Sequence, residues 1–269
     1  MTSVSVTRNK AKIAGRVIEV LDYFNDKHRE ATVMDIVRHY DRPQSSTSEL
    51  LHSLVELGLL RKNPNSRAFS LTARAAMLGM AGQDTIVRDG SLTRLLDRLV
   101  AQTGLSVALF GMVSLRCQVI SWHPGTRCHA GAVRGLHAGM QERLSDSASG
   151  WLLLSTVGQQ RWEGIIRRLN AEAAENQKFL ASELASQLHQ CSDSGFVHGP
   201  AGFGVQGHIM AALLPPETCQ HAMAAGFVYG AKDGVNPSNL RDCLMEAVSH
   251  VAAPTESRPA RIESIYNAA

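Results

Sequence analysis

Apolar residues recur with helical spacing through the first part of the chain. In the first segment they lie three or four positions apart: Ile13, Val17, Leu21 and Phe24. This spacing predicts a helix over residues 11–25 with one apolar face. A second helix is predicted after Thr32, whose hydroxyl can cap it with Asp35 as the capping-box partner. Its apolar residues are Val33, Ile36, Val37 and Tyr40.

A third helix is predicted between Pro43 and Gly58, because proline favours the first turn of a helix and glycine its C-terminal end. It is expected to bury Leu50, Leu51, Leu54 and Leu57. Two short strands are predicted at 59–62 and 67–71, around a turn at 63–66, with Leu60 facing inward beside Phe69 and Leu71. Three helices followed by such a hairpin predict a winged helix-turn-helix domain over residues 1–74.

Residues 75–101 are predicted to form a linker helix that follows this domain. Four leucines lie on one face of its second half: Leu92, Leu95, Leu96 and Leu99. We interpret this face as part of a contact between subunits; the alternative is the core of the following domain, and both can hold for different halves of the segment. Three glycines interrupt the segment, which weakens the prediction of one continuous helix: Gly79, Gly82 and Gly90.

From residue 102 the pattern changes to a mixture of strand-like and helix-like segments. Strands are predicted at 105–112, 117–122, 208–214 and 222–230. Helices are predicted at 144–155, 159–190 and 236–251. The fold class is therefore predicted to be α+β, with helices packed against a sheet over residues 102–253. Residues 254–269 are predicted to be a flexible tail.

The positive charge of the chain is concentrated in its first quarter. The net charge of the 269 residues is +3, but residues 1–74 hold 12 Lys and Arg against 8 Asp and Glu, a net charge of +4. The remaining residues carry 15 basic and 16 acidic side chains, a net charge of −1. This division favours a small polyanion-binding module in front of a nearly neutral domain.

Composition excludes several other classes of protein. With 44% hydrophobic and 19% charged residues, the chain is not a charge-rich disordered protein. Its five scattered cysteines argue against a disulfide framework and fit a reducing cytoplasm. The basic N-terminus is not followed by the apolar segment of a signal peptide, and the longest apolar runs are too short for a membrane span. We therefore expect a cytoplasmic protein with no membrane partner.

The third helix begins with short polar side chains, which allow a helix to approach a nucleic-acid groove closely. The run from Pro43 to Leu51, together with 57–60 and 69–71, resembles the DNA-binding domain of the IclR family of bacterial transcriptional regulators. Two residues depart from the family pattern: Gln44 stands where lysine is common, and Glu49 where arginine often is. The resemblance implies a homo-oligomer, a dimer or a dimer of dimers, on a double-stranded, partly palindromic DNA operator.

Eight residues are predicted to contact this DNA. From the recognition helix and the turn before it they are Arg42, Gln44, Ser45, Ser46 and Ser48. From the wing, where they can reach phosphates or the minor groove, they are Arg61, Lys62 and Arg67.

The same resemblance implies a GAF-like effector-binding domain in the second part of the chain. Residues 146–154 are similar to the family's Ala-Ser-Gly-Lys segment, with Trp151 in place of the lysine. By motif and spacing, the positions that contact a small-molecule effector are Ala148, Ser149, Phe203, Leu213, Phe227 and Tyr229. Such a lining favours an aromatic or otherwise apolar effector. The alternative is that these strands face a filled core.

Two other functions stay open at this point. The second domain of a DNA-binding regulator can serve oligomerisation alone, and an enzyme can carry a regulatory N-terminal module. No catalytic residue is predicted, since Ser149 lacks the first glycine of a nucleophile elbow. Residues 202–207 match the dinucleotide fingerprint, but they neither follow a buried strand nor open a helix, so no cofactor is predicted. No metal is predicted either, since the spacing of a zinc site is missing among Cys117, His123, Cys128, His129 and His137.

Overall fold

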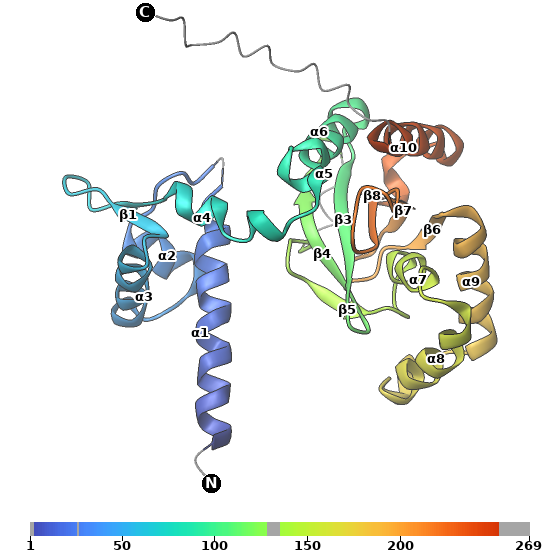
Figure 1. The fold of residues 1–269 in the computed structure, drawn as a ribbon, viewed down its shortest axis with the longest axis horizontal. Helices are drawn as coiled ribbons and strands as arrows, with labels where there is room; N and C mark the ends of the chain where they lie inside the picture. Colours follow the sequence, from blue (N-terminus) through green and yellow to red (C-terminus); the bar gives the residue numbers. More distant parts are fainter. Residues whose placement is uncertain (1–2, 26, 128–134, 253–269) are drawn as a thin grey trace, which may run out of the picture. The chain divides into compact units, whose positions relative to one another are not determined.

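The computed structural model describes residues 3–25, 27–127 and 135–252, so the predicted tail at 254–269 lies outside the described residues. The chain divides into two compact units, residues 1–83 and 84–269. The first contains α1 (Ser3–Tyr23), α2 (Val33–Tyr40), α3 (Gln44–Glu56), β1 (Leu60–Lys62), β2 (Phe69–Leu71) and α4 (Ala73–Met77) (Figure 1). Three helices and an antiparallel hairpin form the predicted winged helix-turn-helix.

The start of α2 is fixed by the capping box that the sequence predicts. The Thr32 hydroxyl accepts a hydrogen bond from the Asp35 N–H at 3.3 Å, and the Asp35 carboxylate accepts one from the Thr32 N–H at 2.8 Å. The two hydrogen bonds that the Asp35 carboxylate accepts, from the Thr32 N–H and from the Thr32 hydroxyl, lower the pKa of this carboxyl below its usual range. Gly58 follows α3 with φ at +73°, a left-handed conformation that glycine adopts without strain.

The core of this unit is formed by Val20, Tyr23, Phe24, Ala31, Ile36, Leu51, Leu54, Leu59, Leu60 and Phe69. Three residues that the pattern places in the core are instead exposed: Ile13 by 54%, Leu57 by 61% and Leu71 by 39%. Val17 and Val20 of α1 and Phe24, the residue after it, form the packed stripe and are three and four positions apart. Leu57 lies at the end of α3 and Leu71 at the end of β2, where the helix or strand periodicity no longer determines which way a side chain points.

The predicted linker helix over 75–101 is wrong as a single element. The segment forms α4, a short turn of 3-10 helix at Met80–Gly82, α5 (Thr85–Arg88) and α6 (Ser91–Thr103). Gly79 has φ at +78° and Gly90 has φ at +74°. A left-handed residue ends a right-handed helix, so these glycines divide the segment.

The second unit is built on a six-stranded sheet in the order β5–β4–β3–β8–β7–β6, in which every neighbouring pair is antiparallel. The strands are β3 (Ser106–Val113), β4 (Arg116–His123), β5 (Gln141–Arg143), β6 (Phe196–Pro200), β7 (His208–Leu213) and β8 (Met223–Tyr229). The main helices are α6, α7 (Ala148–Ser155), α8 (Trp162–Ala171), α9 (Ala181–Ser194) and α10 (Pro237–Ala252).

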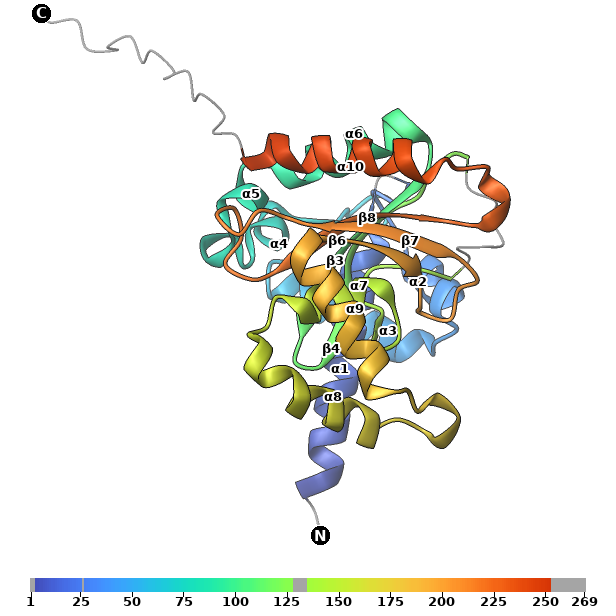
Figure 2. The same cartoon turned by 90° about the vertical axis from the view of Figure 1, so that its right-hand side faces the viewer.

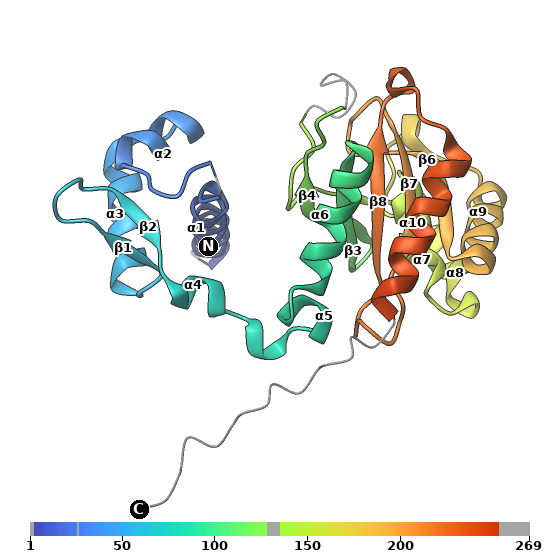
Figure 3. The same cartoon turned by 90° about the horizontal axis from the view of Figure 1, so that it is seen from above.

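Helices cover both faces of this sheet. In Figure 2, α6 and α10 lie across one face, and α7, α8 and α9 lie on the other. Figure 3 shows α6 and α10 side by side over the strands. Every residue of β8 is buried, which is expected of a strand that has packed helices on both sides. The predicted α+β class is confirmed, while the two edge strands β5 and β6 were not predicted.

The four leucines of α6 belong to the core beneath α10. Leu92, Leu95, Leu96 and Leu99 are exposed by 6%, 5%, 2% and 0%, and they pack with Leu240, Leu244 and Phe227. The interpretation that places a subunit contact on these side chains is therefore wrong, and the alternative of a domain core is correct. No helix in the described part of the chain combines the length and apolar character that crossing a membrane requires.

Candidate functional site

The outward face of α3 carries the polar residues expected to read DNA. Gln44 and Ser45 are exposed, whereas Ser46 and Ser48 are half-buried. The Pro43 carbonyl accepts hydrogen bonds from the Ser46 hydroxyl at 3.2 Å and from the buried Thr47 hydroxyl at 2.9 Å. Gln44 and Ser45 are therefore the side chains of this turn that are most accessible to a ligand.

Arg42 is held within the domain. Its Nη2 lies 2.5 Å from the Glu19 Oε2, and its guanidinium carbon lies 5.9 Å from the centre of the Tyr40 ring. The side chain is 27% exposed. This ion pair joins α1 to the turn before α3, so a contact from Arg42 to DNA requires either the exposed part of its guanidinium or loss of the pair.

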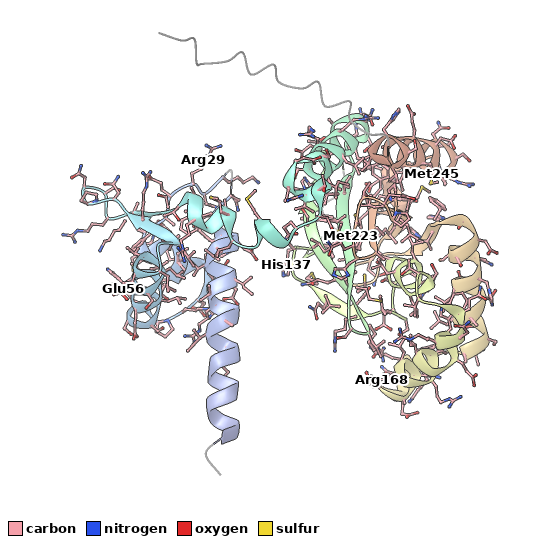
Figure 4. The ribbon with its side chains drawn as sticks, viewed as in Figure 1. Arg29, Glu56, His137, Arg168, Met223 and Met245 are labelled. Atoms are coloured by element: carbon pink, nitrogen blue, oxygen red, sulfur yellow. The ribbon has the colours of Figure 1, made fainter. Side chains whose placement is uncertain are left out.

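The wing presents its basic side chains to solvent. Arg61, Lys62 and Arg67 are all exposed, and Figure 4 shows nitrogen-tipped side chains around this hairpin. The turn is ordered by Asn63, whose carbonyl accepts the Arg67 N–H and whose Oδ1 accepts the Asn65 N–H, both at 2.9 Å. Arg67 has φ at +57°. The sequence pattern thus brings three cations to one hairpin, as phosphate binding requires.

His52 connects this wing to α3, and the sequence reasoning did not single it out. Its Nδ1 lies 2.7 Å from the Ser48 carbonyl oxygen, and its Nε2 lies 3.2 Å from the Lys62 Nζ. Lys62 also lies over the Phe69 ring, with Nζ 5.6 Å from its centre. The position of His52 four residues after Ser48, on the same helix face, is a signal that could have found it.

The match of residues 14–64 to the model of the IclR helix-turn-helix domain decides the identity of this region. The N-terminal unit is an IclR helix-turn-helix domain. The resemblance that the sequence shows to the IclR family is thereby confirmed. The IclR domain match includes α2 and α3 and ends just after β1, so Arg67 and β2 of the wing lie beyond it. A comparison with curated proteins found no match.

Solved IclR structures share the fold of most of this chain. An IclR homolog from Microbacterium hydrocarbonoxydans, complexed with 4-hydroxybenzoate, is 18% identical, with a TM-score of 0.57 over 89% of this chain and 97% of its own. The IclR of Thermotoga maritima is 14% identical, with a TM-score of 0.59 over 90% of this chain and 98% of its own. An IclR regulator from Alicyclobacillus acidocaldarius is 18% identical, with a TM-score of 0.55 over 90% of this chain and 95% of its own. The two-part IclR fold is thus common to these chains.

The six predicted effector positions do not line one cavity. Ala148, Ser149, Phe203 and Leu213 lie on the α7 side of the sheet. Phe227 and Tyr229 lie on the opposite side, in the core beneath α6 and α10. Strand geometry correctly places Phe227 and Tyr229 on one face. The alternation of residues does not show which helices cover this face, so it could not show that the face lies beneath α6 and α10.

Buried hydroxyls form a hydrogen-bonded cluster at the start of α7. Ser147 caps the helix and accepts the Gly150 N–H at 3.2 Å, and its Oγ lies 3.1 Å from the Ser149 Oγ. The Cys117 thiol donates to the Ser149 Oγ at 3.5 Å. Burial raises the pKa of the Cys117 thiol to about 12, so this thiol is a donor here and not a nucleophile.

A carboxyl group from β5 lies beside this cluster. The Oε2 of Glu142 accepts the Phe203 N–H at 2.5 Å, while its buried Oε1 has no hydrogen-bond partner. Burial raises the pKa of the Glu142 carboxyl to about 7. Glu142 was not among the predicted site residues, because it lies in a short polar strand that the pattern does not predict.

Replacing Glu142 by glutamine is expected to remove a pH dependence of stability. The pKa of this carboxyl is raised from its ordinary value of 4.5 to about 7, so the folded protein keeps a proton that the unfolded chain loses. The free energy of unfolding should therefore fall as the pH rises from about 4.5 to about 7. Across this range, the melting temperature of Glu142→Gln relative to that of the wild-type protein should rise with pH. A constant difference would contradict this assignment.

The glycine-rich segment at 202–207 connects β6 to β7 as a hairpin, with Pro200 paired to His208. A strand follows it where the dinucleotide fingerprint needs a helix. Among the described residues, no group of three His, Cys, Asp or Glu side chains is placed to hold a metal ion. Two of the metal candidates, Cys128 and His129, lie outside the described residues.

Two cavities lie among the helices on the α7 side. One of about 310 Å³ is bordered by Trp151, Ser145 and the start of α9. The Trp151 indole N–H donates to the Ser145 carbonyl at 2.9 Å, which fixes this wall. A second cavity, of about 600 Å³, lies between α8 and α9 and is bordered by Trp162 and Ile166.

Proposed function

We propose that this chain is a transcriptional regulator that binds an operator through the N-terminal domain and changes its DNA affinity when a small molecule binds the C-terminal unit. The observation that carries the proposal is the IclR helix-turn-helix, with an accessible α3 face and three exposed basic residues on the wing. Its place of action is proposed to be the cytoplasm. No catalytic residue is proposed, because Ser149 is fully buried and has no neighbouring base among its hydrogen-bond partners.

The effector is proposed to bind on the α7 side of the sheet, near Ala148, Ser149, Phe203 and Leu213. This side joins buried hydroxyls to aromatic rings, since Phe203 stacks on Phe110 with ring centres 6.1 Å apart. Such a combination suits an aromatic molecule with few polar groups. The Microbacterium hydrocarbonoxydans homolog complexed with 4-hydroxybenzoate supports a small aromatic effector.

Arg67→Ala is expected to weaken binding to every DNA sequence alike. Each phosphate contact contributes about −0.9 to the slope of log affinity against log salt, so the variant should flatten the slope by about one. Gln44→Ala should instead cost about 1–3 kcal/mol at particular bases. Gel shifts at several salt concentrations, on operator and scrambled DNA, measure both effects. Arg168→Ala on α8 of the other unit is the control, and equal slopes for Arg67→Ala and wild type would exclude the wing contact (Figure 4).

The oligomer is proposed to use apolar side chains near α4 in place of the α6 leucines. Met77, Leu78 and Met80 are exposed by 66%, 55% and 41%. A symmetric dimer would cover this patch and present two helix-turn-helix domains to paired half-sites. Met77→Glu combined with Leu78→Glu is expected to give folded monomers by light scattering. Leu180→Glu, at a residue 63% exposed in the other unit, should leave the oligomer intact. An intact oligomer in the double variant would refute this placement.

A second candidate function is DNA binding by a chain whose C-terminal unit only oligomerises. The filled core around Phe227 and Tyr229 favours it, since two of the predicted effector positions are packed against helices. Thermal shifts of the full chain against a metabolite library distinguish the two functions. A ligand that raises the melting temperature and changes operator affinity supports an effector-binding domain. If no compound in the library does both, the result supports a C-terminal unit that only oligomerises.

A further inference from the structure

The cavity between α8 and α9 has a fixed apolar wall. Its volume of about 600 Å³ lies within the range of about 300–1,000 Å³ that small-molecule pockets span. Trp162 and Ile166 border it and are exposed by only 4% and 5%, and the Trp162 indole N–H donates to the Val157 carbonyl at 2.8 Å. Ala181 and Ala185 of α9 border it with small side chains. The cavity therefore offers an apolar surface to a small ligand.

Hydrogen bonds tie the segment that joins the two helices to the end of α8. The Asn170 side-chain amide donates to the Phe179 carbonyl at 3.0 Å, and its Oδ1 accepts the Phe179 N–H at 3.3 Å. The Lys178 Nζ donates to the Asn170 carbonyl at 2.7 Å. Because these bonds already hold this side of the cavity, a ligand can bind without first ordering the segment.

Lys178 brings a positive charge to this cavity. The Asn170 carbonyl takes one of its three N–H donors and leaves the charge in place. No ion pair among the described residues includes Lys178. The other two charged residues that border the cavity neutralise each other, since the Arg167 Nη2 lies 2.6 Å from the Glu163 Oε1. Two basic side chains and one acidic side chain give this lining a net charge of +1.

The smaller cavity, of about 310 Å³, has the opposite charge. Glu183 is the one charged residue among those that border it. A carboxylate is repelled there, whereas it is attracted to the lining that holds Lys178. Of these two cavities, the one between α8 and α9 is therefore the better match for an anion.

We propose that this cavity binds an apolar monocarboxylate, with its hydrocarbon body against Trp162 and Ile166 and its carboxylate hydrogen-bonded to Lys178. Removal of apolar surface from water favours binding, and the charge-assisted hydrogen bond orients the ligand. The residues that border the cavity include none of the proposed effector positions. The site thus goes beyond the proposed function and does not depend on it.

Calorimetry on the full chain tests this proposal with two acids and their uncharged amides: cinnamate with cinnamamide, and octanoate with octanamide. The wild-type protein should bind at least one acid about tenfold more tightly than its amide, as a hydrogen bond to a charged group at an exposed lysine allows. The preferred pair shows whether the body is a ring or an alkyl chain. Lys178→Gln keeps an N–H donor for the Asn170 carbonyl and removes the charge, so the affinity for the acid should fall about tenfold while that for the amide is unchanged. Lys232→Gln, at an exposed lysine of the same unit, is the control and should change neither.

A second variant tests the place of binding. Ala181→Leu puts a larger side chain at an exposed residue that borders the cavity, so it should weaken the acid and its amide together, several-fold, without lowering the melting temperature. Ala101→Leu, at an exposed alanine of α6, is the matched control and should leave binding unchanged.

Acid binding that neither Lys178→Gln nor Ala181→Leu changes would place the anion elsewhere and overturn the proposal. Equal affinity of the wild-type protein for both acids and their amides, or no binding of either acid, would overturn it as well. These titrations contain no DNA, so their outcome is independent of whether the chain binds an operator.

Discussion

Leu99→Ala is expected to lower the free energy of unfolding of the C-terminal unit by about 2–5 kcal/mol, the usual cost of a cavity left by a fully buried leucine. Leu99 has no exposed surface and packs in the core between the sheet, α6 and α10. Urea unfolding followed by circular dichroism gives the change. The oligomeric state, measured by light scattering, should not change.

Leu180→Ala is the matched control, because it makes the same substitution in the same unit at a side chain that is 63% exposed. Its effect should stay within about 0.5 kcal/mol of zero. If Leu99→Ala dissociated the oligomer and left the unfolding curve unchanged, Leu99 would belong to a subunit contact and not to the core beneath α10.

Gly150→Ala is expected to destabilise the same unit by about 1–3 kcal/mol or more, because the added methyl group has no space. A Cβ at this position would lie 2.4 Å from the carbonyl oxygen of Leu144, and a backbone atom cannot move aside as a flexible side chain does. The start of α7 would have to shift away from residues 142–144. Thermal unfolding measures the loss.

Gly164→Ala, in α8, provides a control of opposite sign. A Cβ there meets nothing within 4 Å, and alanine is the better helix former. This variant should gain up to about 1 kcal/mol of stability. Equal effects of the two substitutions would show that helix propensity, and not the contact with Leu144, decides the result at Gly150.

The sequence predicts best where structure is local. The capping box of Thr32 and Asp35 and the helix that begins after Pro43 depend on residues within one turn, and all are present. The strands β3, β4, β7 and β8 also follow from apolar runs. β5 and β6 were missed, because one is three polar residues and the other contains glycine and proline.

The candidate site was harder to predict because it depends on contacts between distant segments. The alternation of side chains along a strand places Phe227 and Tyr229 on the same face, but it does not show that α6 and α10 cover that face. Leu92 to Leu99 form an apolar stripe whether they meet another subunit or their own sheet. Glu142 and Phe203 are 61 positions apart, and only the fold brings them together. The DNA-facing residues follow from short-range spacing, and their contacts to DNA stay predictions.

Strand β8 separates two cores that share its backbone. Ala224 packs on the α7 side and Ala225 on the side of α6 and α10, and both are fully buried. Close-packed interiors do not absorb added volume. A larger side chain at either alanine therefore pushes the same backbone toward the opposite core. Redesign of the α7 side through this strand needs a compensating change beneath α10, so the two halves of the unit cannot be repacked independently.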